Sequence, residues 1–213
     1  MLACNSSSEE SQLSSDDNYF KVKNGLTTGI DFENTLSSTP QLNILNYLYF
    51  YNGAGVCAAD FNNDTLPDLF FVSNQKENEL YLNKGQLKFE NQSKAAKIPQ
   101  SHWSTGATAV DINQDGLMDI YICQVTGLNG EITQNQLLVN QGLDSDGIPQ
   151  FKNEAEKYGL NISSYAQQAG FFDFDNDGDL DMFLLNHSLH PNRTYGKGNK
   201  RKDYNFKAGD KLF

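Results

Sequence analysis

The sequence predicts an all-β protein built from repeated four-stranded antiparallel sheets, and three observations lead to this fold class. The chain of 213 residues contains 24 Asn, 18 Asp and 17 Gly, which favour turns, together with 14 Phe and 10 Tyr. That mixture is typical of many short strands joined by tight turns. An Asp-rich nonapeptide also recurs three times, and a strand-like apolar run follows every copy.

The three nonapeptides align without gaps and define the internal repeat. They read DFNNDTLPD at 60–68, DINQDGLMD at 111–119 and DFDNDGDLD at 173–181. Small or apolar residues precede each copy at 55–59, 106–110 and 168–172, and apolar runs follow at 69–72, 120–123 and 182–185. The repeat period therefore changes from 51 to 62 residues through the connecting loops alone.

A second pair of matching segments completes the repeat. NELYLN at 78–83 matches NQLLVN at 135–140, and the segment 87–91 matches 150–154. One repeat thus contains a small inner strand, the Asp loop, an apolar strand, its hairpin partner and an outer strand. Four such strands form the blade of a β-propeller, and blades must stack because one alone leaves its faces open. We expect an incomplete set of about three blades, with a solenoid as the structural alternative.

The expected organisation follows from these repeats. Residues 1–17 form a signal remnant and flexible tether, and residues 18–52 pack on the propeller or close it. Blade 1 covers 53–102, blade 2 covers 103–160, and blade 3 covers 161–213. The third blade is incomplete and carries a long, locally basic insertion at 186–210, for which a solvated loop is the plain interpretation and an anionic-ligand contact the alternative.

The N-terminus is similar to the end of a bacterial lipoprotein signal peptide. Cys4 follows small apolar residues and precedes a Ser- and acid-rich run, and in such proteins this Cys carries the lipid. The charged and apolar regions of a full signal are missing. An ordinary N-terminus with an incidental Cys is the alternative.

Composition excludes several classes of protein. The net charge of −11 argues against a nucleic-acid partner, which normally requires a basic face. No stretch approaches 18 apolar residues, so no transmembrane helix is expected. Three Cys are too few for a disulfide scaffold.

The nonapeptides have the donor pattern of calcium loops. Ca²⁺ takes six to eight hard oxygen ligands, and side-chain oxygens at positions 1, 3, 5 and 9 with the backbone carbonyl at position 7 can supply them. The predicted ligands are Asp60, Asn62, Asp64, Leu66, Asp68, Asp111, Asn113, Asp115, Leu117, Asp119, Asp173, Asp175, Asp177, Asp179 and Asp181. Asx-rich turns without metal are the alternative. An EF-hand is excluded because its position 12 here holds Phe71, Ile122 or Leu184 instead of Glu.

The three loops are expected to differ in affinity. The third has carboxylates at positions 1, 3, 5 and 9, whereas Asn113 and Asn62 stand at position 3 of the second and first. Thr65 replaces the Gly of position 6 in the first loop, where a β-branched residue with positive φ costs about 1 kcal/mol or more. Calcium affinity should decrease from the third loop to the second to the first.

These motifs resemble a known repeat. The pattern D-x-[DN]-x-D-[G]-x-x-D after a small-residue strand is similar to FG-GAP or VCBS-type repeats, also present in integrin α-chain propellers. Residues 28–32, 51–56 and 103–106 resemble a narrower group of bacterial surface lipoproteins related to cartilage acidic protein. The resemblance covers about residues 20–213 and implies a seven-bladed propeller, of which three motif copies represent a fragment.

The predicted function is a non-enzymatic, calcium-binding platform on a Gram-negative bacterial surface, with Cys4 as lipid anchor and a protein or glycan as partner. The alternative is the propeller domain of a surface hydrolase acting on polysaccharide or phosphoester. His187 and His190 offer two metal ligands without an evident third, and no G-x-S-x-G, H-E-x-x-H or phosphate loop occurs. Cys57 and Cys123 lie in predicted strands as plain buried thiols. A calcium sensor would need a bistable helix pair, which this β-rich pattern lacks.

Overall fold

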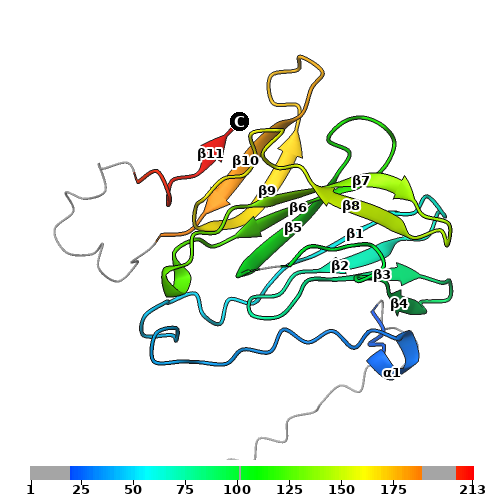
Figure 1. Ribbon diagram of the computed structural model, residues 1–213, viewed down its shortest axis with the longest axis horizontal. Helices are drawn as coiled ribbons and strands as arrows, with labels where there is room; N and C mark the ends of the chain where they lie inside the picture. Colours follow the sequence, from blue (N-terminus) through cyan, green and yellow to red (C-terminus); the bar gives the residue numbers. More distant parts are fainter. Residues whose placement is uncertain (1–19, 101, 189–204) are drawn as a thin grey trace, which may run out of the picture.

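The computed structural model describes residues 20–100, 102–188 and 205–213. It contains three antiparallel sheets and very little helix, so the all-β prediction is confirmed (Figure 1). The elements are α1 (Gly25–Thr28), β1 (Val56–Ala59), β2 (Asp68–Phe71), β3 (Glu79–Asn83), β4 (Phe89–Asn91), β5 (Ser104–Val110), β6 (Asp119–Gln124), η1 (Leu128–Gly130), β7 (Gln136–Leu143), β8 (Pro149–Asn153), β9 (Ala166–Phe172), β10 (Asp181–Asn186) and β11 (Lys211–Leu212).

Each sheet is a meander of sequence-adjacent strands. The first has the order β1-β2-β3-β4 and the second β5-β6-β7-β8, and the third has β9-β10-β11 within the described residues. The register is equivalent in all three, because the last Asp of each nonapeptide pairs with the residue just before its loop: Asp68 with Ala59, Asp119 with Val110 and Asp181 with Phe172. The strands therefore match the predicted order of inner strand, Asp loop, apolar strand and hairpin partner.

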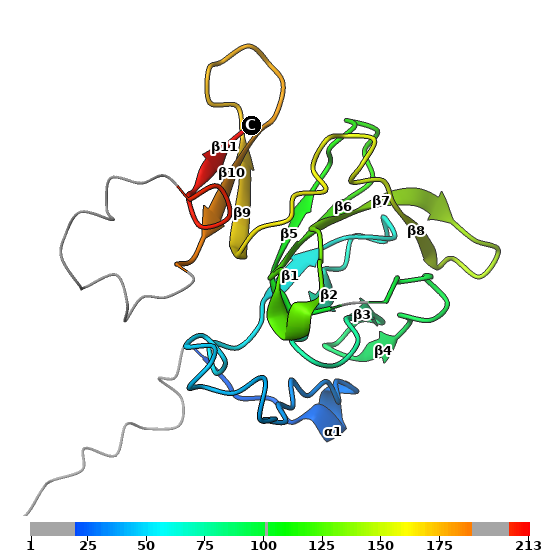
Figure 2. The same cartoon turned by 60° about the vertical axis from the view of Figure 1, so that its left-hand side comes forward.

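The first strands of the three sheets lie side by side, β1 against β5 and β5 against β9 (Figure 2). Their small residues make this approach possible. A Cβ on Gly55 would lie 2.9 Å from the Cα of Gly106, and a Cβ on Gly106 would lie 2.3 Å from the carbonyl oxygen of Gln167. The hydroxyls of Thr105 and Thr108 donate from β5 to carbonyls of β9 at 2.8 and 2.7 Å. Small residues thus occupy the inner strands, as the sequence indicates.

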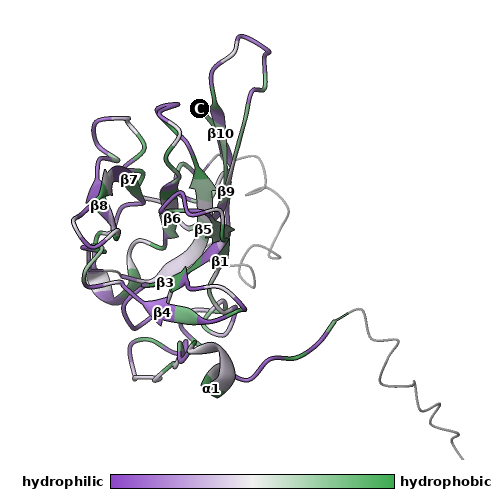
Figure 3. Ribbon diagram, turned by 90° about the vertical axis from the view of Figure 1, so that its right-hand side faces the viewer, coloured by the Kyte–Doolittle hydropathy of each residue, from purple (hydrophilic) through white to green (hydrophobic). Residues whose placement is uncertain are grey.

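Larger apolar residues fill the spaces between sheets. One core cluster joins Phe70 and Val72 after the first loop to Ile120 and Ile122 of β6. A second cluster joins the opposite face of β6, including Tyr121, to Met182 and Leu184 of β10. Because side chains alternate along a strand, each second strand contributes one residue set to each neighbouring sheet. Hydrophobic and hydrophilic residues accordingly mix along the strands (Figure 3).

The segment before the first sheet contains α1 and otherwise no regular element in its described part, residues 20–55. Asn24 caps α1 by accepting a hydrogen bond from the Leu26 amide at 2.9 Å. Further along, Leu42, Tyr47 and Phe50 are buried in a third cluster with Trp103, Val125 and Tyr165. This segment thereby contacts residues that border both the second and the third sheet.

Part of the same segment covers the outer face of the first sheet. Phe32 stacks on Phe71 with ring centroids 4.9 Å apart, and the Tyr81 hydroxyl donates to Asp31 at 2.6 Å. In contrast, the outer face of the third sheet, which is equivalent to the Phe70 face of the first, exposes Phe172, Phe183, Leu185 and Leu212 by 39–48%. No helix among the described residues is both long and apolar enough to cross a membrane.

Candidate metal-binding loops

The three nonapeptides connect the first and second strands of their sheets and lie at equivalent positions: between β1 and β2, between β5 and β6, and between β9 and β10. The inner strands lie side by side, so the loops emerge at the same end of the molecule. The sheet architecture therefore places three acidic loops in a row on one end, while the β6–β7 connection lies at the opposite end of β6.

The backbone of each loop wraps around the first carboxylate. In the second loop, Asp111 accepts hydrogen bonds from the amides of Asp115 at 3.1 Å and Gly116 at 2.9 Å, and Asp115 accepts one from the Leu117 amide at 2.8 Å. The first loop repeats these contacts, with Asp60 accepting from Asp64 at 3.0 Å and Thr65 at 2.7 Å. This wrapping turns the side chains of positions 1, 3 and 5 toward a common centre.

Left-handed backbone at position 6 makes the turn. Gly116 and Gly178 have φ of 83° and 94°, and Thr65 adopts a φ of 71° at the equivalent point. The strain expected for Thr65 is therefore present in the structure, because a β-branched residue rarely adopts this conformation.

The third loop has the densest group of carboxylates. Asp173, Asp175 and Asp177 are exposed, and each offers a carboxylate oxygen so that the three atoms lie within 4.8 Å of one another. Desolvation and the neighbouring Asp177 raise the pKa of Asp175, and the Asp177 carboxylate raises the pKa of Asp179 through its hydrogen bond and its charge. Mutual repulsion of this kind is relieved by a bound cation.

The first two loops have an amide where the third has a carboxylate. The Asn113 amide nitrogen donates to Asp115 at 2.8 Å, and its oxygen accepts from the Asp115 backbone amide at 3.2 Å. Asn62 makes the same pair of contacts with Asp64 at 3.0 and 3.2 Å. An amide oxygen is a good calcium ligand but carries no charge, so these two loops offer a weaker field to a divalent cation.

The carboxylate at position 9 also supports the fold. Asp68 is fully buried and accepts hydrogen bonds from the amides of Phe61 at 3.0 Å and Asn83 at 2.7 Å. Asp119 does the same with Ile112 at 3.0 Å and Asn140 at 2.7 Å. Desolvation raises the pKa of both carboxyls to about 6, although the hydrogen bonds from these amides act to lower it.

In the third loop, Asp181 accepts from the Phe174 amide at 2.7 Å. Position 9 thus fixes the loop to the sheet, and carboxylate lone pairs remain available for a cation.

Sequence reasoning missed two Asn residues that brace these loops. Asn83 and Asn140 are the last residues of the matching segments 78–83 and 135–140. Their side-chain amides donate to the carbonyls of Pro67 at 2.9 Å and Met118 at 3.3 Å, respectively. Asn140 additionally donates to the Phe61 carbonyl of the neighbouring loop at 2.9 Å. The signal was the shared last Asn of NELYLN and NQLLVN, which the strand pattern alone left without a role.

Backbone carbonyls of Leu66, Leu117 and Asp179 stand at position 7 of the loops, as the alignment requires. The donor set of each loop is therefore all oxygen, and in the third loop three carboxylates lie close together. Such hard donors fit Ca²⁺, which tolerates flexible geometry, better than Mg²⁺, which keeps its waters. When bound, calcium would supply positive charge that neutralises the loop. These residues can hold and orient such an ion.

The remaining predicted residues lie elsewhere. Cys4 and His190 are outside the described residues. His187 is buried away from the loops, with its ring between Tyr47, Tyr49 and Tyr165.

The thiols of Cys57 and Cys123 are not paired with each other. Burial raises the pKa of Cys57 to about 12 and that of Cys123 still further, so both thiols stay protonated.

Two comparisons with known proteins agree with this geometry. Residues 60–122, which include the first two loops, match the family described as FG-GAP-like repeat. A stretch of 128 residues is 27% identical to the human T-cell immunomodulatory protein. That stretch covers 59% of this chain and 19% of the relative, so the chain spans about a fifth of the length of the relative that it matches.

The resemblance to an FG-GAP-type repeat is thereby confirmed over part of the chain. The FG-GAP-like repeat suggests a propeller-type binding module. The narrower group of bacterial surface lipoproteins stays a prediction.

Proposed function

We propose that this chain is a calcium-binding β-propeller module of a bacterial cell-surface lipoprotein, which binds a protein or glycan partner without catalysing a reaction. One observation carries the proposal: three equivalent loops with converging carboxylate and amide oxygens lie at one end of three packed sheets. Calcium in these loops neutralises repelling carboxylates and rigidifies the turns. The loops at the opposite end remain available for a partner.

The propeller arrangement is supported by how the sheets pack. Small inner strands adjoin one another, and equivalent positions of successive second strands face the following sheet. Phe70 faces the second sheet and Tyr121 the third. Lipid attachment at Cys4 would hold the module at the outer membrane of a Gram-negative bacterium. Conversion of Cys4 to Ser in the bacterial host should release the protein from membranes, as fractionation would show.

Thermal unfolding followed by far-UV circular dichroism tests the calcium role. We expect a β-type spectrum and a midpoint that rises markedly when chelator is replaced by millimolar calcium, because ligands that bind only the native state stabilise it. A β-type spectrum whose midpoint ignores calcium would contradict the metal role.

Titration with calcium then separates the loops. Asp177→Asn should weaken the tightest site at least about tenfold, which corresponds to about 1.4 kcal/mol. Asp146→Asn is the matched control, since Asp146 is an exposed carboxylate in the β7–β8 turn, outside the three loops. Equal affinities in the two variants would overturn the affinity order from third to second to first loop.

A further inference from the structure

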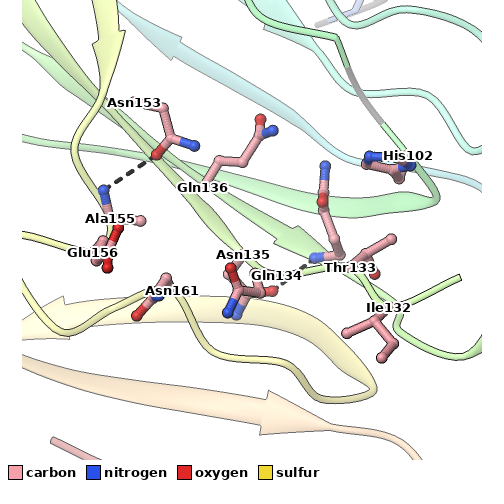
Figure 4. Close-up of a pocket in the computed structure, with 11 residues that line it drawn as sticks. His102, Ile132, Thr133, Gln134, Asn135, Gln136, Asn153, Ala155, Glu156 and Asn161 are labelled. Carbon is pink, nitrogen blue, oxygen red and sulfur yellow. Dashed lines mark hydrogen bonds between the residues drawn. The ribbon is translucent and has the colours of Figure 1, made fainter.

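A cavity of about 320 Å³ lies at the end of the second sheet opposite its metal loop (Figure 4). The β6–β7 connection contributes Ile132 and Thr133, and the segment after β8 contributes Glu156 and Asn161. His102, before β5, lies on the side opposite Asn153 and Glu156, with Gln136 between them. The cavity is within the size range of small-ligand sites.

Side-chain amides dominate the lining of this cavity. Six Asn or Gln residues contribute to it: Gln124, Gln134, Asn135, Gln136, Asn153 and Asn161. Apolar contact comes from Ile132 and Ala155, which is too little to anchor an apolar peptide side chain. Two residues of the lining can carry charge: His102, which lies 3.5 Å from Glu131 outside the lining, and Glu156.

Some of these amides are already used by the fold. The Asn135 side chain accepts a hydrogen bond from the backbone amide of Gln124 at 2.8 Å and donates one to the Tyr121 hydroxyl at 2.9 Å. Asn153 accepts from the Ala155 amide at 3.1 Å. These hydrogen bonds hold Asn135 and Asn153 in place in the wall of the cavity.

Other polar groups of the lining have no hydrogen-bond partner among the described residues. The side-chain oxygens of Gln124 and Gln136 are buried without such a partner there, and Gln124 is 1% exposed. The side chains of Gln134 and Asn161 also line the cavity and make no hydrogen bond with the described part of the chain. Buried unpaired acceptors are unfavourable, so a ligand that donates hydrogen bonds gains affinity here.

We propose that this cavity binds a neutral, hydroxyl-rich ligand, that is, a sugar unit of a glycan. Each hydroxyl both donates and accepts, which matches a wall of amides with both functions. The lining has no Lys or Arg to hold an anion, and its single carboxylate, Glu156, is too few for a metal. This site rests on the proposed function as a binding module and names its ligand class.

A neighbouring cavity gives the glycan room to extend. It measures about 580 Å³ and shares His102 with the first, and Glu131 lines it as well. The His102–Glu131 pair therefore lies at the boundary between the two spaces. Oligosaccharides should accordingly bind more tightly than the single sugar from which they are built.

A glycan array carrying neutral, anionic and cationic glycans tests the proposal, with the full chain held at saturating calcium. Neutral glycans should bind selectively, and saturation-transfer NMR should confirm the best of them in solution. The double variant Gln134→Ala/Asn161→Ala should weaken that binding about tenfold, as expected for the loss of two hydrogen bonds. Gln92→Ala is the matched control, because Gln92 follows β4 as Glu154 follows β8, the equivalent strand of the second sheet, and Gln92 does not line the cavity.

The outcomes separate this site from the proposed function. The sugar site is overturned if the calcium-stabilised protein binds no neutral glycan, binds charged glycans only, or binds only an unstructured peptide added as a competitor. Each of these results leaves the proposed calcium-binding module unaffected. Binding of a neutral glycan that both Gln134→Ala/Asn161→Ala and Gln92→Ala leave unchanged also overturns it. Selective binding by a protein that calcium does not stabilise supports the sugar site and contradicts the metal role.

Discussion

At the scale of single residues, the first nonapeptide contains a conformational cost that the other two avoid. Thr65 has a φ of 71° where Gly116 has 83°. A Cβ built on Gly116 would meet no atom within 4 Å, so the left-handed backbone is the main obstacle to a side chain there. The two positions therefore form a reciprocal pair for experiment.

Thr65→Gly should raise the free energy of unfolding by about 1 kcal/mol, because the left-handed strain exceeds the entropic cost of Gly. Gly116→Thr should lower it by a similar amount. Urea denaturation in chelator measures both without the contribution of metal. A lower free energy of unfolding for Thr65→Gly would contradict the strain argument. It would indicate that Thr65 holds its backbone amide in place for the hydrogen bond to Asp60 better than Gly does.

His187 predicts a dependence of stability on pH. The Tyr47 hydroxyl lies 2.9 Å from its Nε2 and the Ser188 carbonyl 3.1 Å from its Nδ1, which suits a neutral ring that donates from Nδ1. Desolvation lowers the pKa of His187 below its usual value. A group with a lowered folded-state pKa stabilises the fold fully above its unfolded pKa, about 6.5, and less as the pH falls toward the folded value.

The free energy of unfolding should therefore fall on acidification below about pH 6.5 more steeply in the wild type than in His187→Gln. The comparison with the variant is needed because Asp68 and Asp119, with pKa values of about 6, act in the opposite direction. Denaturation curves at pH 7.5, 6.5 and 5.5, in calcium-free buffer, give the difference. Parallel curves for the two proteins would exclude His187 as the source.

At the scale of elements, the strands and their order could be predicted from the sequence, whereas the contacts between loops could not. The repeated nonapeptide and the matching segments ending in Asn83 and Asn140 indicated four strands per repeat, because period-2 patterning and turn residues are local signals. The bond from Asn140 to Phe61 joins residues 79 apart, and no local pattern encodes it. The burial of Asp68 and Asp119 likewise depends on the following hairpin, so a ligand role alone was predicted for them.

A comparison of Asn140 with Asn83 measures how much a hydrogen bond between two sheets contributes beyond one within a sheet. Each amide supports its own loop, but only Asn140 also reaches a carbonyl of the preceding sheet among the described residues. Asn140→Ala should lower the free energy of unfolding by about 1 kcal/mol more than Asn83→Ala, since it leaves the Phe61 carbonyl unpaired. Chemical denaturation measures both, and equal losses would show that the bond between sheets contributes nothing.

At the scale of the whole molecule, the three sheets differ in what covers them. Equivalent residues follow the last Asp of each loop by two positions: Phe70, Tyr121 and Phe183. The first two are fully buried against the next sheet, whereas Phe183 is 39% exposed. The third sheet thus presents the face that, in the others, receives a neighbour, and contiguous apolar faces of this kind promote association.

Adjacent residues of β10 test this directly. Leu184 is fully buried against the second sheet, and Leu185 points the other way and is 44% exposed. Leu184→Ala should cost about 2–5 kcal/mol of unfolding free energy, and Leu185→Ala should cost far less.

The face itself should control association in solution. Sedimentation velocity should show concentration-dependent self-association of the wild type, and Phe183→Ser/Leu185→Ser should reduce it while unfolding remains nearly unchanged. If the double serine variant associates as strongly as the wild type, association uses another surface. If it unfolds as readily as Leu184→Ala, the exposed face supports the fold of the chain, and the stacking assigned to the other two sheets does not extend to the third.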